Sequence, residues 1–254
     1  MTEVLRTERL SVRYGGVQAL VDLDLAVSEG QLVGLIGPNG AGKTTFIDAV
    51  GGFASCSGNV ILRGEDISRL PPHRRARRGL ARTWQSGDLF DDLSVRENLL
   101  VAAGAGAWGS TLREVLTGQT AESELVDQAL AEVGLERLAD RGAGELTQGQ
   151  RKLVGVARAL ASGPRAVCLD EPAAGLDSEE SRELGKRLRA VADRGMAMIL
   201  VDHDMGLVLS VCDQVVVLDF GRVIATGVPD EIRQSHVVIE AYLGRAAEEV
   251  SAPV

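Results

Sequence analysis

Apolar and polar residues alternate near the N-terminus of the chain. Residues 10–14 (LSVRY) and 20–25 (LVDLDL) place every second side chain on one apolar face, as half-buried antiparallel strands do. Gly15-Gly16 and Glu29-Gly30 supply the turns that end these runs. The pattern predicts a small antiparallel sheet.

Three later runs are apolar without alternation. They span residues 32–36 (LVGLI), 166–169 (AVCL) and 198–201 (MILV). Strands that are covered on both faces of a parallel sheet have this pattern. We therefore expect an α/β fold in which helices cover a parallel sheet, as in nucleotide-binding domains.

The strand pattern disappears between about residues 87 and 144. Residues 94–98 and 122–133 have helical periodicity and capping-type starts. We expect a helical lobe inserted into the sheet domain. Further along, residues 215–218 and 223–225 flank a turn and predict a hairpin, and a last helical piece ends at residues 243–244.

Residues 145–160 predict an amphipathic helix with a polar beginning. Apolar residues recur from Leu153 to Leu160 at i, i+3, i+4 and i+7 spacing, which gives the helix one buried face. The helix begins near Gly149, so residues 146–150 (LTQGQ) lie at its start. Unpaired N–H groups and the positive end of the helix dipole make such a start a site for an anion.

Composition limits the class of protein. The chain has 254 residues, 45% of them hydrophobic, enough for one large α/β domain or two smaller lobes. Its formal net charge of −9 disfavours nucleic acid as the principal partner, because duplex binding neutralises phosphates. We expect the basic residues 73–78 (HRRARR), which follow Pro71-Pro72, to be a solvated helix face; a phosphate-binding patch is the alternative.

Cysteines and apolar runs bear on location. The three cysteines have no metal-site spacing, so we expect reduced thiols in a cytosolic protein. The N-terminal residues lack a signal-peptide pattern, and no apolar run approaches the roughly 18 residues that span a bilayer. Any role at a membrane would depend on a partner protein.

A glycine-rich loop directly follows the first buried strand. It fits the pattern G-x-x-x-x-G-K-[ST] and opens a helix, the context that a phosphate-binding loop requires. This phosphate loop consists of Gly37, Pro38, Asn39, Gly40, Ala41, Gly42, Lys43, Thr44 and Thr45. We expect Lys43 to reach the β- and γ-phosphates and the Thr44 hydroxyl to bind Mg²⁺. The loop predicts a site for ATP or GTP.

Two carboxylates, Asp170 and Glu171, follow another buried strand. Asp170 is placed to hold the magnesium shell, which leaves Glu171 to orient and deprotonate the attacking water. An acidic pair can also be an ordinary strand-end turn. The phosphate loop elsewhere in the chain favours the catalytic interpretation.

The polar helix start at residues 146–150 resembles the signature motif of ATP-binding-cassette (ABC) ATPases, commonly Leu-Ser-Gly-Gly-Gln. Other motifs of that family occur in the expected order along the chain. Gln85 resembles the Q-loop glutamine, Asp177 of residues 174–177 (AGLD) resembles the D-loop aspartate, and His203 resembles the switch histidine. Tyr14, near the N-terminus, resembles the aromatic residue that stacks on adenine. Tyr14, Gln85 and His203 could each be merely structural, but their order favours function. The resemblance covers residues 4–244.

The resemblance implies a P-loop ATPase fold with a RecA-like parallel-sheet core. An antiparallel β subdomain and the core would comprise residues 4–86 and 160–228, and an inserted helical subdomain about 87–159. A C-terminal helical segment would span 229–244, with 245–254 as a flexible tail. It also implies that Gln85 joins the magnesium site and, with Lys43, Glu171 and His203, catalysis.

Cassettes of this family pair head to tail, so the signature helix of one faces the γ-phosphate held by the other. The anion expected at Thr147, Gln148, Gly149 and Gln150 is then the partner's ATP, and Asp177 belongs to the same nucleotide-binding set. Thr147 and Gln148 stand where the family usually has serine and glycine. Threonine keeps the hydroxyl and glutamine the backbone N–H, so we expect function to survive provided that residue 148 needs no positive φ.

Three functions compete: the ATPase subunit of an importer, a soluble cassette acting on nucleic acid or ribosomes, and a regulatory module with little turnover. The segment between Gln85 and Leu146 is too short for the second cassette or long coiled coil of the soluble relatives. Lys43, Asp170, Glu171 and His203 are all present, which disfavours a module without turnover. Transport is the function that the sequence favours.

Residues 71–85, the Thr-Gln-Gly-Gln variant and residues 238–244 (VIEAYLG) look most like the branched-chain amino acid importer group. Systems for urea or short amides share the pattern, and lipopolysaccharide-export cassettes are similar. The resemblance implies a second cassette subunit, identical or paralogous, transmembrane permease subunits and, indirectly, a substrate-binding protein. It places the chain at the cytoplasmic side of the membrane.

Overall fold

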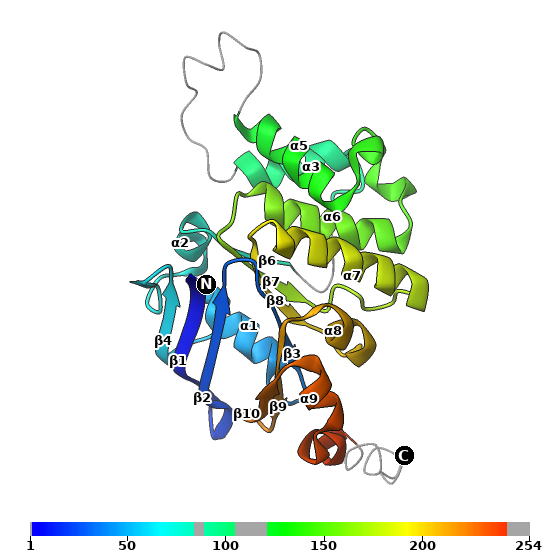
Figure 1. The fold of residues 1–254 in the computed structure, drawn as a ribbon. Helices are drawn as coiled ribbons and strands as arrows, with labels where there is room; N and C mark the ends of the chain where they lie inside the picture. The colour runs from blue at the N-terminus through cyan, green and yellow to red at the C-terminus, as the bar shows by residue number, and fades with distance from the viewer. Residues whose placement is uncertain (1, 84–88, 105–120, 243–254) are drawn as a thin grey trace.

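The computed structural model describes residues 2–83, 89–104 and 121–242. An antiparallel sheet at one side of the molecule has the strand order β2-β1-β4-β5 (Figure 1). Its strands are β1 (Glu3–Tyr14), β2 (Val17–Ser28), β4 (Cys56–Leu62) and β5 (Glu65–Asp66). The alternating N-terminal pattern therefore forms the predicted antiparallel sheet.

The second sheet has the order β10-β9-β3-β8-β7-β6. Its strands are β3 (Leu32–Ile36), β6 (Leu80–Arg82), β7 (Ala166–Asp170), β8 (Ala197–Val201), β9 (Gln214–Asp219) and β10 (Arg222–Gly227). Neighbours from β9 to β6 are parallel, whereas β9 and β10 form an antiparallel hairpin. The predicted α/β fold and C-terminal hairpin are confirmed.

Successive residues of the parallel strands enter two different hydrophobic cores. In β3, Leu32 and Ile36 belong to the core that the helical lobe shares with two helices further along the chain, while Val33 and Leu35 belong to the core around α1 (Lys43–Gly51) and the antiparallel sheet. This two-residue period follows from the pleat of a strand. Both faces are buried, which explains why these strands are apolar throughout.

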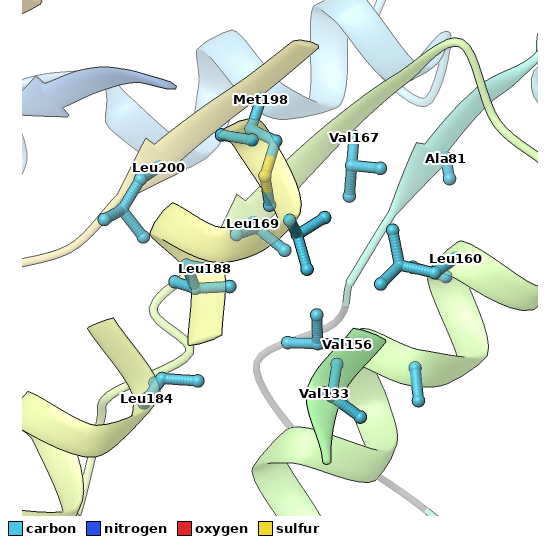
Figure 2. Packing of buried hydrophobic residues seen from close by; sticks show 14 of the residues in the cluster. Ala81, Val133, Val156, Leu160, Val167, Leu169, Leu184, Leu188, Met198 and Leu200 are labelled. Carbon is cyan, nitrogen blue, oxygen red and sulfur yellow. The ribbon is translucent and has the colours of Figure 1, made fainter. Parts of the chain in front are cut away.

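Helices α3 (Val95–Gly104), α5 (Ala121–Val133) and α6 (Gln148–Ala161) form the expected helical lobe. Figure 2 shows Val156 and Leu160 of α6 directed toward Val167 of β7, with Val133 of α5 close by. Further α-helices within the described residues are α7 (Ser178–Asp193), α8 (Met205–Val211), α9 (Pro229–Gln234) and residues 236–242. No described helix has the length and apolar character that crossing a membrane requires.

The basic stretch forms the short helix α2 (Pro72–Arg77) and is largely exposed as expected, but one of its arginines is buried. Arg75 is only 3% exposed. Its guanidinium donates hydrogen bonds of 2.8 and 2.7 Å to the carbonyls of Ala49 and Val50 at the end of α1. A buried cation is tolerated there because the carbonyls at a helix C-terminus carry partial negative charge, although burial lowers the pKa of Arg75.

Candidate active site

The phosphate loop runs from the end of β3 into α1, and its glycines allow close approach of other backbone segments. A Cβ atom at Gly37 would collide with the carbonyl of Leu218. Gly42 has φ 108°, in the left-handed region, and a Cβ there would lie 2.8 Å from the carbonyl oxygen of Ala19. Glycine is needed at both positions because a side chain would displace a neighbouring strand.

Lys43 lies inside the curve of this loop. The residue is 6% exposed, and its Nζ donates hydrogen bonds to the carbonyl oxygens of Gly37 at 2.6 Å and Pro38 at 3.1 Å. The ammonium group is therefore held where the backbone curls around it. A phosphate entering the loop would replace neutral acceptors with charged ones, which form stronger hydrogen bonds.

A cavity of about 350 Å³ lies over the loop. Besides residues 39–45 and Glu171, its walls include residues 17–19 and the tip of the β9–β10 hairpin, Phe220 and Gly221. Gly221 donates its N–H to the carbonyl of Ala41 at 2.9 Å, so the hairpin tip is bonded to the loop. These wall residues were missed from the sequence; the apolar Phe220 in a turn was the available signal. Tyr14 is half exposed and does not line this cavity.

Asp170 ends β7 and is almost completely buried, with 2% exposure. Its Oδ2 accepts a hydrogen bond from Arg82 at 2.9 Å, and its N–H donates to the Thr83 hydroxyl at 3.0 Å. Oδ1 is buried and has no hydrogen-bond partner. Burial raises the pKa of Asp170, although the hydrogen bond and charge of Arg82 act in the opposite direction.

Glu171 and His203 lie together because β7 and β8 are neighbours. Glu171 has φ 47° and donates its N–H to the carbonyl of Val201 at 2.7 Å. His203 Nδ1 lies 4.0 Å from Glu171 Oε2 and 3.6 Å from Asp202 Oδ1. A positive φ at a residue other than glycine is strained and is often found at functional sites. The imidazole is 60% exposed, so it can reach a bound ligand.

The signature segment, residues 146–150, forms the start of α6 within one residue of the expected position. Thr147 is the N-cap: its hydroxyl accepts from the N–H of Gln150 at 3.3 Å, and the Gln150 side chain accepts from the N–H of Thr147 at 3.0 Å. Gln148 is the first helical residue and is absent from the residues with positive φ. The unusual glutamine therefore fits the backbone without strain.

Helix α7 lies directly against the signature segment. A Cβ atom at Gly149 would be 2.9 Å from Glu180 Oε1, so only glycine fits without a shift of that side chain. Asp177 is the N-cap of α7 and accepts hydrogen bonds of 2.8 Å from the N–H groups of Glu179 and Glu180. Its carboxylate thus has a structural role within the chain.

The structure brings only part of the expected set to one cavity. Residues 39–45 of the phosphate loop and Glu171 line the same cavity, with Asp170 and His203 beside Glu171, but none of the described residues 146–150 or Asp177 lines it. Gln85, expected in metal binding and catalysis, lies outside the described residues. The signature segment therefore does not contribute to the phosphate cavity of its own chain.

The described residues fit a magnesium ion that is bound together with a nucleotide. They contain no cluster of three or more histidine, cysteine and acidic side chains that could hold a metal alone. Mg²⁺ typically uses one or two carboxylates, water and substrate phosphates. Thr44 lines the phosphate cavity, and the unpaired Oδ1 of Asp170 is the kind of oxygen that such an ion or its water requires.

The C-terminal helix also approaches the phosphate loop. Tyr242 packs against the hydrophobic core, and burial raises its pKa to about 12, with an opposing influence of the nearby Gly37 backbone; its hydroxyl is buried without a hydrogen-bond partner among the described residues. No sequence pattern indicated this contact. It places the C-terminal segment next to the first residue of the loop.

Comparison with known proteins agrees with this geometry. Residues 20–174 match the family model described as ABC transporter, and residues 222–248 match the model described as branched-chain amino acid ATP-binding cassette transporter.

Individual relatives match over nearly the whole chain. The chain is 39% identical to the high-affinity branched-chain amino acid transport ATP-binding protein BraF of Pseudomonas aeruginosa. The match covers 96% of this chain and 98% of that protein. The chain is also 35% identical to the lipopolysaccharide export system ATP-binding protein LptB of Haemophilus influenzae, covering 95% and 97%. The crystal structure of an ABC transporter cassette in its ADP conformation superposes with a TM-score of 0.84 at 29% identity, covering 96% and 100%.

Proposed function

The chain belongs to the ABC transporter family of ATP-binding cassettes, and on that premise we propose that it powers an importer for branched-chain amino acids. The observation that supports this cargo class is the match of the C-terminal residues 222–248 to a model specific for such cassettes. The 39% identity to BraF across 96% of the chain agrees with it. The cargo itself would be bound by other subunits.

We assign the chemical roles as follows. The phosphate loop and Lys43 bind the triphosphate, Glu171 orients and deprotonates the attacking water, and His203 contacts the γ-phosphate. Thr44, Asp170 and Gln85 would hold Mg²⁺, which supplies positive charge against the phosphates. The distance of 4.0 Å between Glu171 and His203 supports this, because both can face the same terminal phosphate.

We propose that two cassettes close over the nucleotide. The N-terminus of α6 offers backbone N–H groups, yet it does not line the phosphate cavity of its own chain. A second cassette, identical or paralogous, would bring those donors and the dipole of α6 to the γ-phosphate. Hydrolysis would then remove the charge that holds the pair together.

Permease subunits are the proposed receivers of this motion. A groove of about 600 Å³ runs between α2, β6 and α6. Its wall combines apolar residues with charged or polar ones, which include His73, Arg82, Lys152, Arg158 and Asp170. A helical segment from a membrane subunit would fit such a groove and would place this chain at the cytoplasmic face. A soluble substrate-binding protein would join the complex indirectly.

Lipopolysaccharide export is the second candidate function, because LptB is 35% identical over 95% of the chain. The two are separated by isolating the protein from detergent-solubilised membranes and identifying its partners. Import predicts two permeases and a second cassette, together with branched-chain amino acid uptake that is lost on gene deletion and restored by the wild-type chain. Recovery of ribosomes or DNA-repair factors in place of permeases, or normal uptake in the deletion strain, would refute the proposal.

A further inference from the structure

Arg82, the last residue of β6, lies between two carboxylates of other elements. Its side chain is 10% exposed and forms ion pairs with Asp48 of α1 and, at 2.9 Å, with Asp170 at the end of β7. The guanidinium also lies over the ring of Phe53, 5.6 Å from its centroid. One side chain thus connects the helix that follows the phosphate loop with the strand that ends in the proposed magnesium ligand.

We propose that Arg82 is a positioning residue for magnesium-dependent nucleotide binding. By holding Oδ2 of Asp170, it fixes the carboxylate so that Oδ1, which is buried and unpaired, remains available to the cation or its water. The inference rests on the proposed ATPase function. It adds a role to a residue that lies outside the phosphate loop and outside the carboxylate pair.

The backbone of Asp170 is held independently of Arg82. Its N–H donates to the Thr83 hydroxyl at 3.0 Å, and the N–H of Thr83 donates to the carbonyl of Cys168 at 2.9 Å. Loss of the guanidinium would therefore leave the strand in register. What would change is the direction of the Asp170 carboxylate, because Oδ2 would lose its donor.

The chemistry of the site requires arginine. A planar guanidinium has several donors in fixed directions, so it can serve Asp48 and Asp170 at once, whereas an ammonium is a single point charge. Without the guanidinium of Arg82, the negative charges of Asp48 and Asp170 would lose their positively charged partner. Groups that orient a metal ligand from behind typically contribute 10- to 100-fold to metal affinity or activity.

Arg75 provides a matched control inside the same chain. It is also buried and also contacts α1, but its hydrogen bonds go to the backbone carbonyls of Leu70, Ala49, Val50 and Ser68. A loss of Arg75 would weaken packing around α1 without touching Asp170. Arg75→Gln therefore separates loss of stability from loss of positioning.

The experiment measures ATP affinity by calorimetry with and without Mg²⁺, together with the melting temperature, for wild type, Arg82→Gln, Arg82→Lys and Arg75→Gln. The readout is the ratio of the dissociation constant without Mg²⁺ to that with Mg²⁺. We expect Arg82→Gln to lower this ratio about 10- to 100-fold while Mg²⁺-free affinity stays near wild type. Arg75→Gln should lower the melting temperature and leave the ratio unchanged.

Arg82→Lys keeps the positive charge at this position, and it serves as the test variant if Arg82→Gln does not fold. It should lower the ratio in the same direction but less, because an ammonium cannot hold both carboxylates. An unchanged ratio in the Arg82 variants, or an equal fall in Arg75→Gln, would overturn the inference while the proposed function stands. If the wild-type chain itself shows no magnesium-dependent ATP binding, the proposed function fails first.

Discussion

The phosphate loop and the signature segment both carry glycines and begin helices, but they differ in how far the rest of the chain encloses them. The loop is enclosed: Lys43 bonds to its carbonyls, and the β9–β10 hairpin bonds to Ala41. The signature segment is capped by its own side chains, and Thr147 and Gln148 are exposed at its start. One segment is complete within the chain, whereas the other presents its donors outward, as half of a composite site would.

The largest expected effect is on turnover and concerns Glu171, which lines the cavity of the enclosed phosphate loop. Glu171→Gln keeps the size of the side chain but removes the base, so turnover should fall roughly 10²- to 10⁴-fold while ATP still binds. Steady-state phosphate release and equilibrium ATP binding measure the two quantities. Unchanged hydrolysis would remove Glu171 from its assigned role.

The next largest effect concerns the exposed signature segment. Gly149→Val places a side chain against Glu180 and on the surface that would face the partner's γ-phosphate. The valine side chain should keep the partner's γ-phosphate away from the backbone N–H groups of α6. Turnover should therefore fall about 10²-fold, the usual cost when one preorganised donor no longer reaches the developing charge, while ATP affinity of the isolated chain is unaffected.

The matched control for Gly149→Val is Gln148→Gly, which restores the common residue of the family. It should stay close to wild type because Gln148 already has helical backbone angles. Weaker ATP binding by isolated Gly149→Val subunits would contradict the division between the two segments.

A smaller effect concerns the hairpin that closes over the loop. Gly221 has φ 74°, and a Cβ there would collide with the carbonyl of Ala19, so Gly221→Ala should lower the free energy of unfolding by about 1–3 kcal/mol. Gly15→Ala is the control, since Gly15 also has a positive φ, 56°, but open space around it. Chemical denaturation compares them; equal losses would mean that the close contact with β2 is unimportant.

The smallest effect comes from the cap of α6. Thr147→Ala removes the hydroxyl that accepts the N–H of Gln150, and the free energy of unfolding should fall by about 1 kcal/mol. Thr147→Ser should restore it. A stability unchanged by Thr147→Ala would show that water or Gln150 replaces the cap.

Much of the fold could be predicted because its signals are local. The alternation before β3, the apolar runs of β7 and β8 and the phosphate loop each lie within a few consecutive residues. The start of α6 was predictable for the same reason, since the apolar spacing from Leu153 to Leu160 places it near Gly149.

Contacts between distant residues could not be predicted in this way. Arg82 and Asp170 are 88 residues apart, and Arg75 meets the end of α1 from a stretch that is basic throughout. Nothing in that stretch distinguishes the buried arginine from its exposed neighbours. The contact of Tyr242 with the phosphate loop likewise depends on how the C-terminal helix packs.

The central claim is that nucleotide hydrolysis requires donors from a second cassette. The most direct test is the mass in solution of Glu171→Gln chains, measured by analytical ultracentrifugation with Mg-ATP and with Mg-ADP. We predict a dimer with Mg-ATP, formed by the chain itself or with the second cassette co-purified from its complex, and separate subunits with Mg-ADP. Single subunits with Mg-ATP, also when the membrane partners are supplied, would contradict the claim.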